Sequence, residues 1–271
     1  MSALTFSLLS APPERLDLSP LTPEKLGGMP VRDIEKIRLG QSKRALSVGD
    51  LFRISGSEVA SIVFEGGSRR FDGVGSGLTE GEIRVVGDAG AQAGRNMKGG
   101  RLVIDGDAGP HAGSCMQGGR IEIAGNADDH LGGPLAGELA GMSGGVLIVN
   151  GSAGNFAADR MRRGVIAVLK GCGDHAGARM IAGTLVATGG VGAMPGYLMR
   201  RGSILLDRRP EKLSPSFVEC GAPDIAFAAV IDRYLVAEGI LKRPLLGKSP
   251  SKFGGDNAVF GTGEILFRDE T

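Results

Sequence analysis

Three histidines are the residues of this sequence best suited to acid–base chemistry or to metal binding. His111, His130 and His175 all occupy the same place in an internal repeat, described below. If neighbouring repeat units stack as paired strands, His111 and His130 lie about 5 Å apart. The other units carry Gln, Phe or Met at this place, which indicates a packing position rather than a ligand set. We therefore expect no catalytic residue and no metal site in this chain.

A basic stretch runs from residue 160 to residue 209, where nine Arg and Lys are opposed only by Asp174 and Asp207. Two readings stay open. The stretch is either a solvated face or a docking site for an acidic partner or a polyanionic ligand. The candidate ligand- or partner-binding residues are Arg160, Arg162, Arg163, Arg179, Arg200 and Arg201.

Composition excludes several classes of protein. The net charge of +1 implies neither nucleic-acid binding nor attraction to an acidic membrane. Neither a Walker A sequence nor an HExxH motif is present. The three cysteines are scattered and form no CxxC pair, which favours a reducing compartment. No apolar run reaches the roughly 18 residues that a membrane span needs, so we expect a cytoplasmic protein.

Glycine supplies 47 of the 271 residues and recurs in a fixed frame. The numbering advances by 19 from one unit to the next, except for one interval of 26 that holds a seven-residue insertion within 133–141. The first residues of the seven units are Leu78, Met97, Met116, Met142, Met161, Met180 and Met199. The fourth residue is glycine in every unit: Gly81, Gly100, Gly119, Gly145, Gly164, Gly183 and Gly202.

This frame predicts an all-β fold. A short alternating apolar stretch follows the fourth residue of each unit, as expected of a strand. Several glycines per unit are too many for a helix, at roughly 1 kcal/mol each, but they suit tight corners with positive φ. We expect a right-handed β-solenoid of about seven to eight 19-residue coils, with the methionine column inside. Leucine-rich repeats and hexapeptide helices are excluded because their sequence frames are absent.

The flanks depart from the repeat. We expect an N-terminal cap over 1–56, the solenoid over 57–209, and a C-terminal helix and docking arm over 210–271. Within the cap, Ile34, Ile37 and Leu39 suggest a strand that enters the stack.

The C-terminal region is expected to begin with an amphipathic helix over 224–238, ended by Gly239. Residues 242–264 are then an extended arm of the kind that lies on a partner, and 265–267 a last strand. The apolar face of the helix is expected to consist of Phe227, Val230, Ile231, Tyr234 and Leu235.

Several segments carry a resemblance to a known family. They are Gly-Ser-Ala-Gly-Asn-Phe at 151–156, Gly-Cys-Gly-Asp-His-Ala-Gly at 171–177, Met-Arg-Arg-Gly at 161–164 and 199–202, and the tail at 255–265. Together they resemble the C-type subunit of formylmethanofuran dehydrogenase, over nearly the whole chain. That family is similar in turn to the C-terminal β-helix of the glutamate synthase large subunit.

The resemblance implies a non-catalytic scaffold subunit in an enzyme complex of tetrahydromethanopterin- and methanofuran-dependent one-carbon metabolism. Arg outnumbers Lys by 22 to 9, as in GC-rich bacteria, which favours the formyltransferase/hydrolase complex that oxidises formaldehyde to formate. The implied partners are an amidohydrolase-like A-type subunit, a dehydrogenase-like B-type subunit, and a formyltransferase of D type. The complex would use a methanofuran-type cofactor and tetrahydromethanopterin, with zinc in the hydrolase subunit, while this chain itself would bind no cofactor.

Alternatives remain from other classes. The chain could be the C-type subunit of an archaeal tungsten or molybdenum formylmethanofuran dehydrogenase. It could also be a β-helix acyltransferase that uses a histidine as base, although the irregular glycine spacing disfavours this. A third alternative is a spacer domain like that of glutamate synthase.

Overall fold

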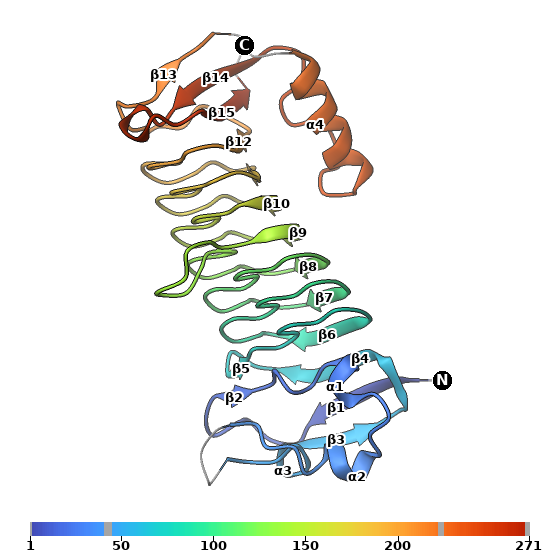
Figure 1. The fold of residues 1–271 in the computed structure, drawn as a ribbon. Coiled ribbons are helices and arrows are strands. Elements are labelled where there is room, and N and C mark those ends of the chain that lie inside the picture. Colours follow the sequence, from blue (N-terminus) through green and yellow to red (C-terminus); the bar gives the residue numbers. More distant parts are fainter. Residues whose placement is uncertain (1, 41–44, 222–224, 269–271) are drawn as a thin grey trace.

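The computed structural model describes residues 2–40, 45–221 and 225–268. The chain is mostly β, and its main feature is one 13-stranded, largely parallel sheet (Figure 1). The strand order is β13-β14-β15-β12-β11-β10-β9-β8-β7-β6-β4-β1-β3. The central strands are β4 (Glu58–Gly67), β6 (Glu82–Gly87), β7 (Arg101–Ile104), β8 (Arg120–Ile123), β9 (Ser143–Val149), β10 (Arg163–Val168), β11 (Thr184–Ala187) and β12 (Ser203–Leu206).

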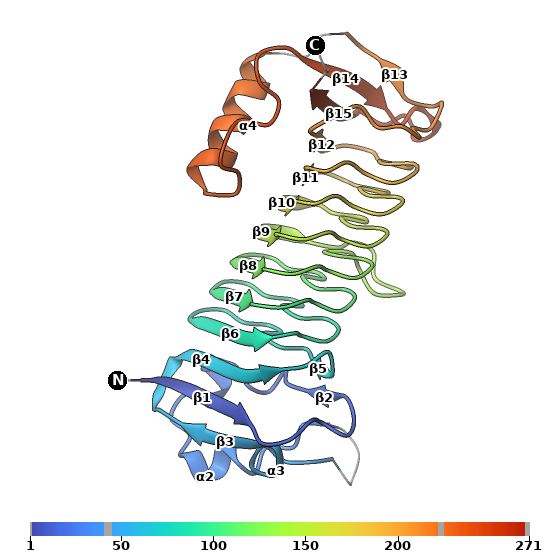
Figure 2. The same ribbon diagram turned by 180° about the vertical axis from the view of Figure 1, so that it is seen from behind.

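The strands pair at the interval of the sequence repeat. Leu102 of β7 lies opposite Ile121 of β8, which holds the same place in the next unit. A second tract of parallel bridges joins the same units on another side, from Ala89 to Ala108, Ala127 and onward to Val191. Each unit is thus a coil that stacks on the one before it (Figure 2), an arrangement compatible with a β-solenoid.

The expected methionine column lies inside the stack. Leu78 and the six methionines that follow it at the first repeat position are all fully buried. Strand side chains alternate around them, so Ile121 and Ile123 point inward while Glu122 points out. A core of aliphatic side chains and methionine, nearly free of aromatic rings within the repeat, fits here because each coil offers only a thin layer to fill.

The fourth-position glycines adopt φ values between +69° and +105°, a region that other L-residues avoid. At Gly119, where φ is +84°, an added Cβ would lie 2.7 Å from the carbonyl oxygen of Gly100 in the preceding coil. Glycine is therefore needed at this corner for its backbone angle and for the close approach of the next coil.

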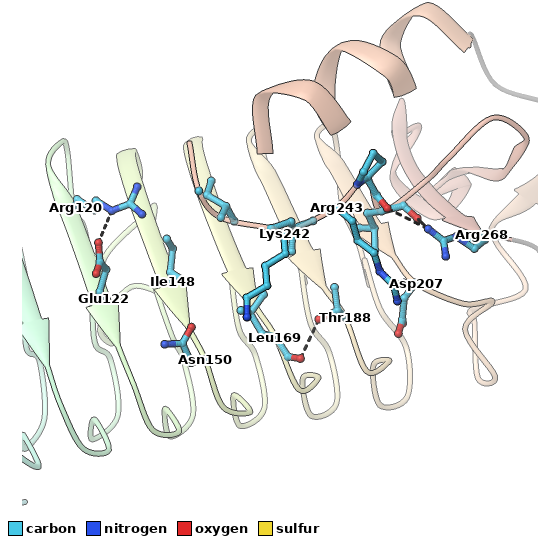
Figure 3. A pocket seen from close by; sticks show the side chains of 15 residues that line it. Arg120, Glu122, Ile148, Asn150, Leu169, Thr188, Asp207, Lys242, Arg243 and Arg268 are labelled. Atoms are coloured by element: carbon cyan, nitrogen blue, oxygen red, sulfur yellow. Dashed lines mark hydrogen bonds and ion pairs between the residues drawn. The ribbon is translucent and has the colours of Figure 1, made fainter. Parts of the chain in front are cut away.

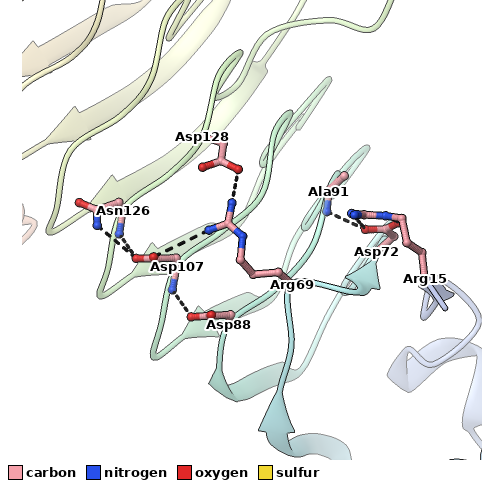
Figure 4. Close-up of polar contacts among 8 residues, drawn as sticks. All are labelled: Arg15, Arg69, Asp72, Asp88, Ala91, Asp107, Asn126 and Asp128. Atoms are coloured by element: carbon pink, nitrogen blue, oxygen red, sulfur yellow. Dashed lines mark hydrogen bonds and ion pairs between the residues drawn. The ribbon is translucent and has the colours of Figure 1, made fainter. Parts of the chain in front are cut away.

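Side-chain amides and carboxylates link the coils at another corner (Figure 4). Asp88 accepts a hydrogen bond from the backbone N–H of Asp107 at 2.8 Å, and Asp107 accepts one from Asn126 at 2.7 Å. Arg69 reaches across two coils to pair with Asp107 and Asp128. These contacts satisfy N–H groups where the strand ladder stops.

The N-terminal strand β1 (Ala3–Leu8) lies parallel to β4 and antiparallel to β3 (Phe52–Ser55), which closes one end of the sheet. The other N-terminal elements are β2 (Leu16–Asp17), which pairs with β5 (Phe71–Asp72), and the one-turn helices α1 (Pro23–Leu26), α2 (Val31–Ile34) and α3 (Val48–Leu51).

The strand expected at Ile34, Ile37 and Leu39 is wrong. Ile34 ends α2, whose N-cap is Pro30, and a turn follows it. Ile34 and Leu39 are nevertheless buried, because a single helical turn followed by a bend also directs both side chains inward. Spacing alone does not separate the two conformations over so short a segment.

The C-terminal segment closes the other end. Strand β15 (Gly263–Arg268) adds in parallel to β12, and β14 (Pro250–Gly255) returns antiparallel to β15 and pairs with β13 (Val218–Glu219). The last strand expected at 265–267 is therefore present. Much of the stretch expected as an extended arm, 242–264, folds back onto the chain's own sheet, including the 3₁₀ turn η1 (Asn257–Val259).

Helix α4 (Ile225–Ala237) stands beside the stack and, with the arm that follows it, covers the outer face of the later coils (Figure 2). A second apolar core forms there, between strand residues such as Val165 and Leu205 and helix-arm residues such as Leu235 and Leu246. Within the described residues, no helix has the length and apolarity that a bilayer crossing requires.

The expected inner face of α4 is only partly correct. Leu235 is buried and Ile231 packs against the second core, but Phe227, Val230 and Tyr234 are exposed. The orientation is set by a polar contact that apolar periodicity does not show.

That contact is made by Asp232. Its carboxylate is buried and accepts backbone hydrogen bonds from Leu245, Leu246 and Gly247 at 2.8 to 3.1 Å. Because this side of the helix must face the arm, the stripe through Phe227, Val230 and Tyr234 turns toward solvent.

We predict that Gly119→Ala lowers the free energy of unfolding by about 2 kcal/mol or more, because strained φ and a close Cβ contact act together. The matched control is Gly77→Ala, where φ is +75° but no atom lies within 4 Å of the added Cβ. Thermal denaturation followed by circular dichroism measures both. Equal losses in the two variants would show that close coil packing contributes nothing.

Candidate partner-binding surface

The histidine column is a stack of rings. The centroids of His111 and His130 are 4.8 Å apart with their planes at 6°, which confirms the expected spacing. Phe156 stacks on His130 at 5.1 Å, and His175 on Phe156 at 4.9 Å. The backbone φ of all four residues lies between 58° and 60°, so one left-handed corner in each coil directs these rings along a common line.

The geometry of this stack favours packing over ligation. In parallel imidazoles the nitrogen lone pairs run side by side and do not converge on one point. The Nδ1 atoms of His111, His130 and His175 are buried and have no hydrogen-bond partner. Burial lowers the pKa of His111, and the neighbouring His130 adds to this effect. The column therefore favours a neutral ring at His111, consistent with the Phe at the same position.

Ser143 lies in a GxSxG spacing at 141–145, a pattern that can mark a nucleophilic serine. Here it begins strand β9, and its hydroxyl points to the carbonyl oxygen of Met116 in the preceding coil at 3.4 Å. The strand-to-helix turn that exposes such a nucleophile is not formed at this place.

Two of the six predicted arginines serve the fold. Arg179 donates two hydrogen bonds to the carboxylate of Asp159, at 2.8 and 2.7 Å, and Asp159 is buried. Arg160 donates from Nη1 to the carbonyl oxygen of Glu138 at 2.8 Å. Arg179 is thus ion-paired within the chain, whereas Arg160 is anchored through one donor to a backbone carbonyl.

The other four arginines form a cationic edge, defined as Arg162, Arg163, Arg200 and Arg201. All four are exposed, at the second and third positions of coils that lie two apart, or about 10 Å. In the residues that the structure describes, none of the four forms an ion pair. The structure thus places four of the six arginines predicted from the sequence along one edge of the stack.

The seven-residue insertion forms a loop anchored by Glu138. The carboxylate accepts from Arg95 at 2.6 Å and from the backbone N–H of Leu135 at 2.7 Å, and Cys115 Sγ lies 3.1 Å from it. Leu139, the next residue, is 87% exposed. The interrupted repeat marks this loop in the sequence, but the repeat alone predicts no role for it.

A groove of about 520 Å³ lies between the arm at 239–245 and the outer face of the coils (Figure 3). Ile148 and Leu169 form part of its apolar floor, and Lys242 extends along the face of the coils. Arg268 fixes one end by donating to the carbonyl oxygens of Pro244 and Leu245 at 3.1 and 2.5 Å.

Sequence reasoning missed this covered face, although a signal exists. The seventh repeat position points outward, and it becomes uniformly apolar midway along the stack. In chain order its residues are Arg84, Val103, Glu122, Ile148, Ala167, Val186 and Leu205. The last four pack in the second core, so the change marks where the arm begins to cover the sheet.

Comparisons with known proteins identify the family. The model of the GXGXG motif family matches residues 40–219. The chain belongs to this family. A solved chain covers 98% of this chain at 41% identity with a TM-score of 0.94, and all of that chain is matched. It comes from the crystal structure of the formyltransferase/hydrolase complex (FhcABCD) of Methylorubrum extorquens with methylofuran.

A curated relative agrees with this match. The C-type subunit of the formyltransferase/hydrolase complex Fhc of Methylorubrum extorquens is 47% identical over 78 residues. That alignment spans 29% of this chain and 29% of the relative, whereas the structural match spans nearly the full length of both chains. The resemblance to the C-type subunit is confirmed.

The ring column predicts a pH-dependent stability. Because the folded pKa of His111 lies below the ordinary value of 6.5, the unfolded state binds more protons as the pH falls below that value, and stability drops. We expect His111→Phe, which keeps a ring, to lose less stability than the wild type between about pH 8 and pH 5. Denaturant unfolding at each pH measures this.

A converse variant tests the same column. Phe156→His places four imidazoles in a row, so the loss of stability at low pH should steepen. An unchanged pH profile in both variants would show that the column does not resist protonation.

Proposed function

We propose that this chain is the non-catalytic structural subunit of a formyltransferase/hydrolase complex. The observation that carries the proposal is the match to a chain of FhcABCD, 41% identical over 98% of this chain. Both comparisons are with bacterial proteins of this complex, which supports the bacterial branch over the archaeal dehydrogenase. The expected partners are the three other subunits of the complex, those of A, B and D type.

The cofactor assignment follows the same comparison. The related complex is described with methylofuran, which supports a methanofuran-type cofactor for the assembly rather than for this chain alone. Tetrahydromethanopterin as formyl donor and zinc in the hydrolase subunit remain part of the proposal. A cytoplasmic location is proposed on the same footing.

The architecture suits a scaffold. We propose the division into an N-terminal cap at 1–56, a right-handed β-solenoid at 57–209 and a C-terminal helix and arm at 210–271. The sheet ends in short strands, β3 of four residues at one end and β13 of two residues at the other. Short edge strands limit end-to-end association, and the sides of the stack stay available to other subunits.

The cationic edge is the proposed contact for one of these partners. Four exposed guanidinium groups without acidic partners in the described chain favour a surface rich in Asp and Glu. Arg160 and Arg179 are left out of this contact because the backbone carbonyl of Glu138 and the carboxylate of Asp159 already orient them within the chain.

The decisive experiment is co-expression of a tagged chain with the three other subunits. We expect all three to co-purify, and we expect formyl transfer and hydrolysis only in the assembled material. Purified chain that turns over a formyl donor without partners would contradict the non-catalytic role. If the tagged chain recovers none of the three other subunits, the assignment to the complex is contradicted.

A charge reversal tests the edge. Arg200→Glu with Arg201→Glu should weaken recovery of at least one partner by about tenfold or more, with a reduced dependence on salt. Arg32→Glu with Arg53→Glu is the matched control, because both arginines are exposed and lie in the N-terminal region. Equal recovery of all subunits by wild type and Arg200/Arg201 variant would assign the edge to solvent.

A further inference from the structure

Helix α4 is apolar on nearly every side. Among the 13 residues of Ile225–Ala237, only Asp232 and Arg233 are charged, and the Asp232 carboxylate is buried against the arm. A surface helix normally shows solvent one polar face, whereas a helix that is apolar all round is normally buried all round. The isolated chain buries only one of its faces.

The buried face accounts for one apolar stripe. Ala228, Ile231 and Leu235, at spacings of three and four, pack against the outer face of the later coils. Asp232 lies beside this stripe and fixes the rotation of the helix through its bonds to the backbone of the arm. The chain itself therefore explains this half of the helix.

A second stripe with the same spacing lies outside. Phe227, Val230 and Tyr234 are 38%, 64% and 38% exposed. Contiguous exposed apolar side chains mark interaction surfaces in soluble proteins. Anchors at i, i+3 and i+7 are the pattern with which one helix packs against another.

Charged residues border the outer stripe. A groove of about 540 Å³ beside the helix is lined by Val236 and Pro244 and bordered by Arg233 and Lys248. Arg233 lies one turn from Val230 on the helix, whereas Glu238, one turn after Tyr234, places an exposed carboxylate at the C-terminal end of the stripe. Apolar anchors beside exposed cations fit an apolar partner surface edged by carboxylates.

We propose that the outer face of α4, defined as Phe227, Val230 and Tyr234, binds an amphipathic helix of another subunit, with Asp or Glu placed to meet Arg233 and Lys248. The inference rests on the proposed function and adds a contact separate from the cationic edge. Another subunit is the chosen occupant because the related chain belongs to a complex of several different subunits. A second copy of this chain is the alternative that the test decides.

The test uses Val230→Glu in the co-expressed complex. Val230 is the most exposed of the three, so the variant should fold with an unchanged melting temperature while the assembly half-dissociates at a concentration at least about tenfold higher. Val31→Glu is the control, since Val31 is a helical residue of similar kind, 42% exposed, in the N-terminal region. Size-exclusion chromatography on dilution gives both values.

A second variant tests the charge of the partner. Arg233→Glu with Lys248→Glu should also weaken the assembly about tenfold and reduce its sensitivity to salt. Tighter assembly in this variant would contradict an acidic partner.

The outcomes separate the two proposals. If wild-type chain recovers no other subunit, the proposed function fails. If wild type assembles and Val230→Glu assembles equally well, only the α4 inference fails. Light scattering of the isolated chain adds one more outcome, because a wild-type dimer that Val230→Glu converts to monomer would show that a second copy covers α4.

Discussion

The close approach of one coil to the next at the fourth-position corner is the constraint on which this structure depends. The carbonyl oxygen of Gly100 lies where a side chain at Gly119 would begin, and the same relation recurs at Gly145 and Gly164. Because glycine has no Cβ, the coils can stack at strand spacing with their hydrogen bonds unbroken. Ladders of identical positions follow from this register, including the buried methionines, the turn-capping carboxylates and the stacked rings.

A fold built this way separates its surfaces by role. The interior is filled with methionine, leucine, isoleucine and other apolar side chains, which repeat in much the same way from coil to coil. Whatever distinguishes one coil from another must therefore lie mainly outside: the arginines at one edge, the insertion loop, and the apolar outer strand faces under the arm. This distribution suits a protein whose task is to hold other proteins in place, and the match to a chain of FhcABCD agrees with that role.

The repeat made the main fold predictable from the sequence, while the additions to the repeat were not. Parallel pairing of successive units, the buried methionine column and the close approach of His111 to His130 all follow from one periodic pattern. The face of α4 was misjudged because a buried carboxylate, Asp232, decides its rotation, and hydrophobic periodicity carries no information on such a bond. Similarly, Arg179 could not be separated from Arg200 before the structure showed Asp159 beside it, since sequence distance does not reveal ion pairs between coils.

The insertion at 133–141 interrupts the repeat without disturbing it. Arg120 and Val146 lie on opposite sides of the insertion in the chain, yet they pair as neighbours in the same register that joins the uninterrupted units. This corner thus accommodates extra chain length while the strand register is kept on either side. Related proteins could lengthen, shorten or replace such a loop independently of the core, so that recognition evolves in one coil while the remainder of the architecture stays constant.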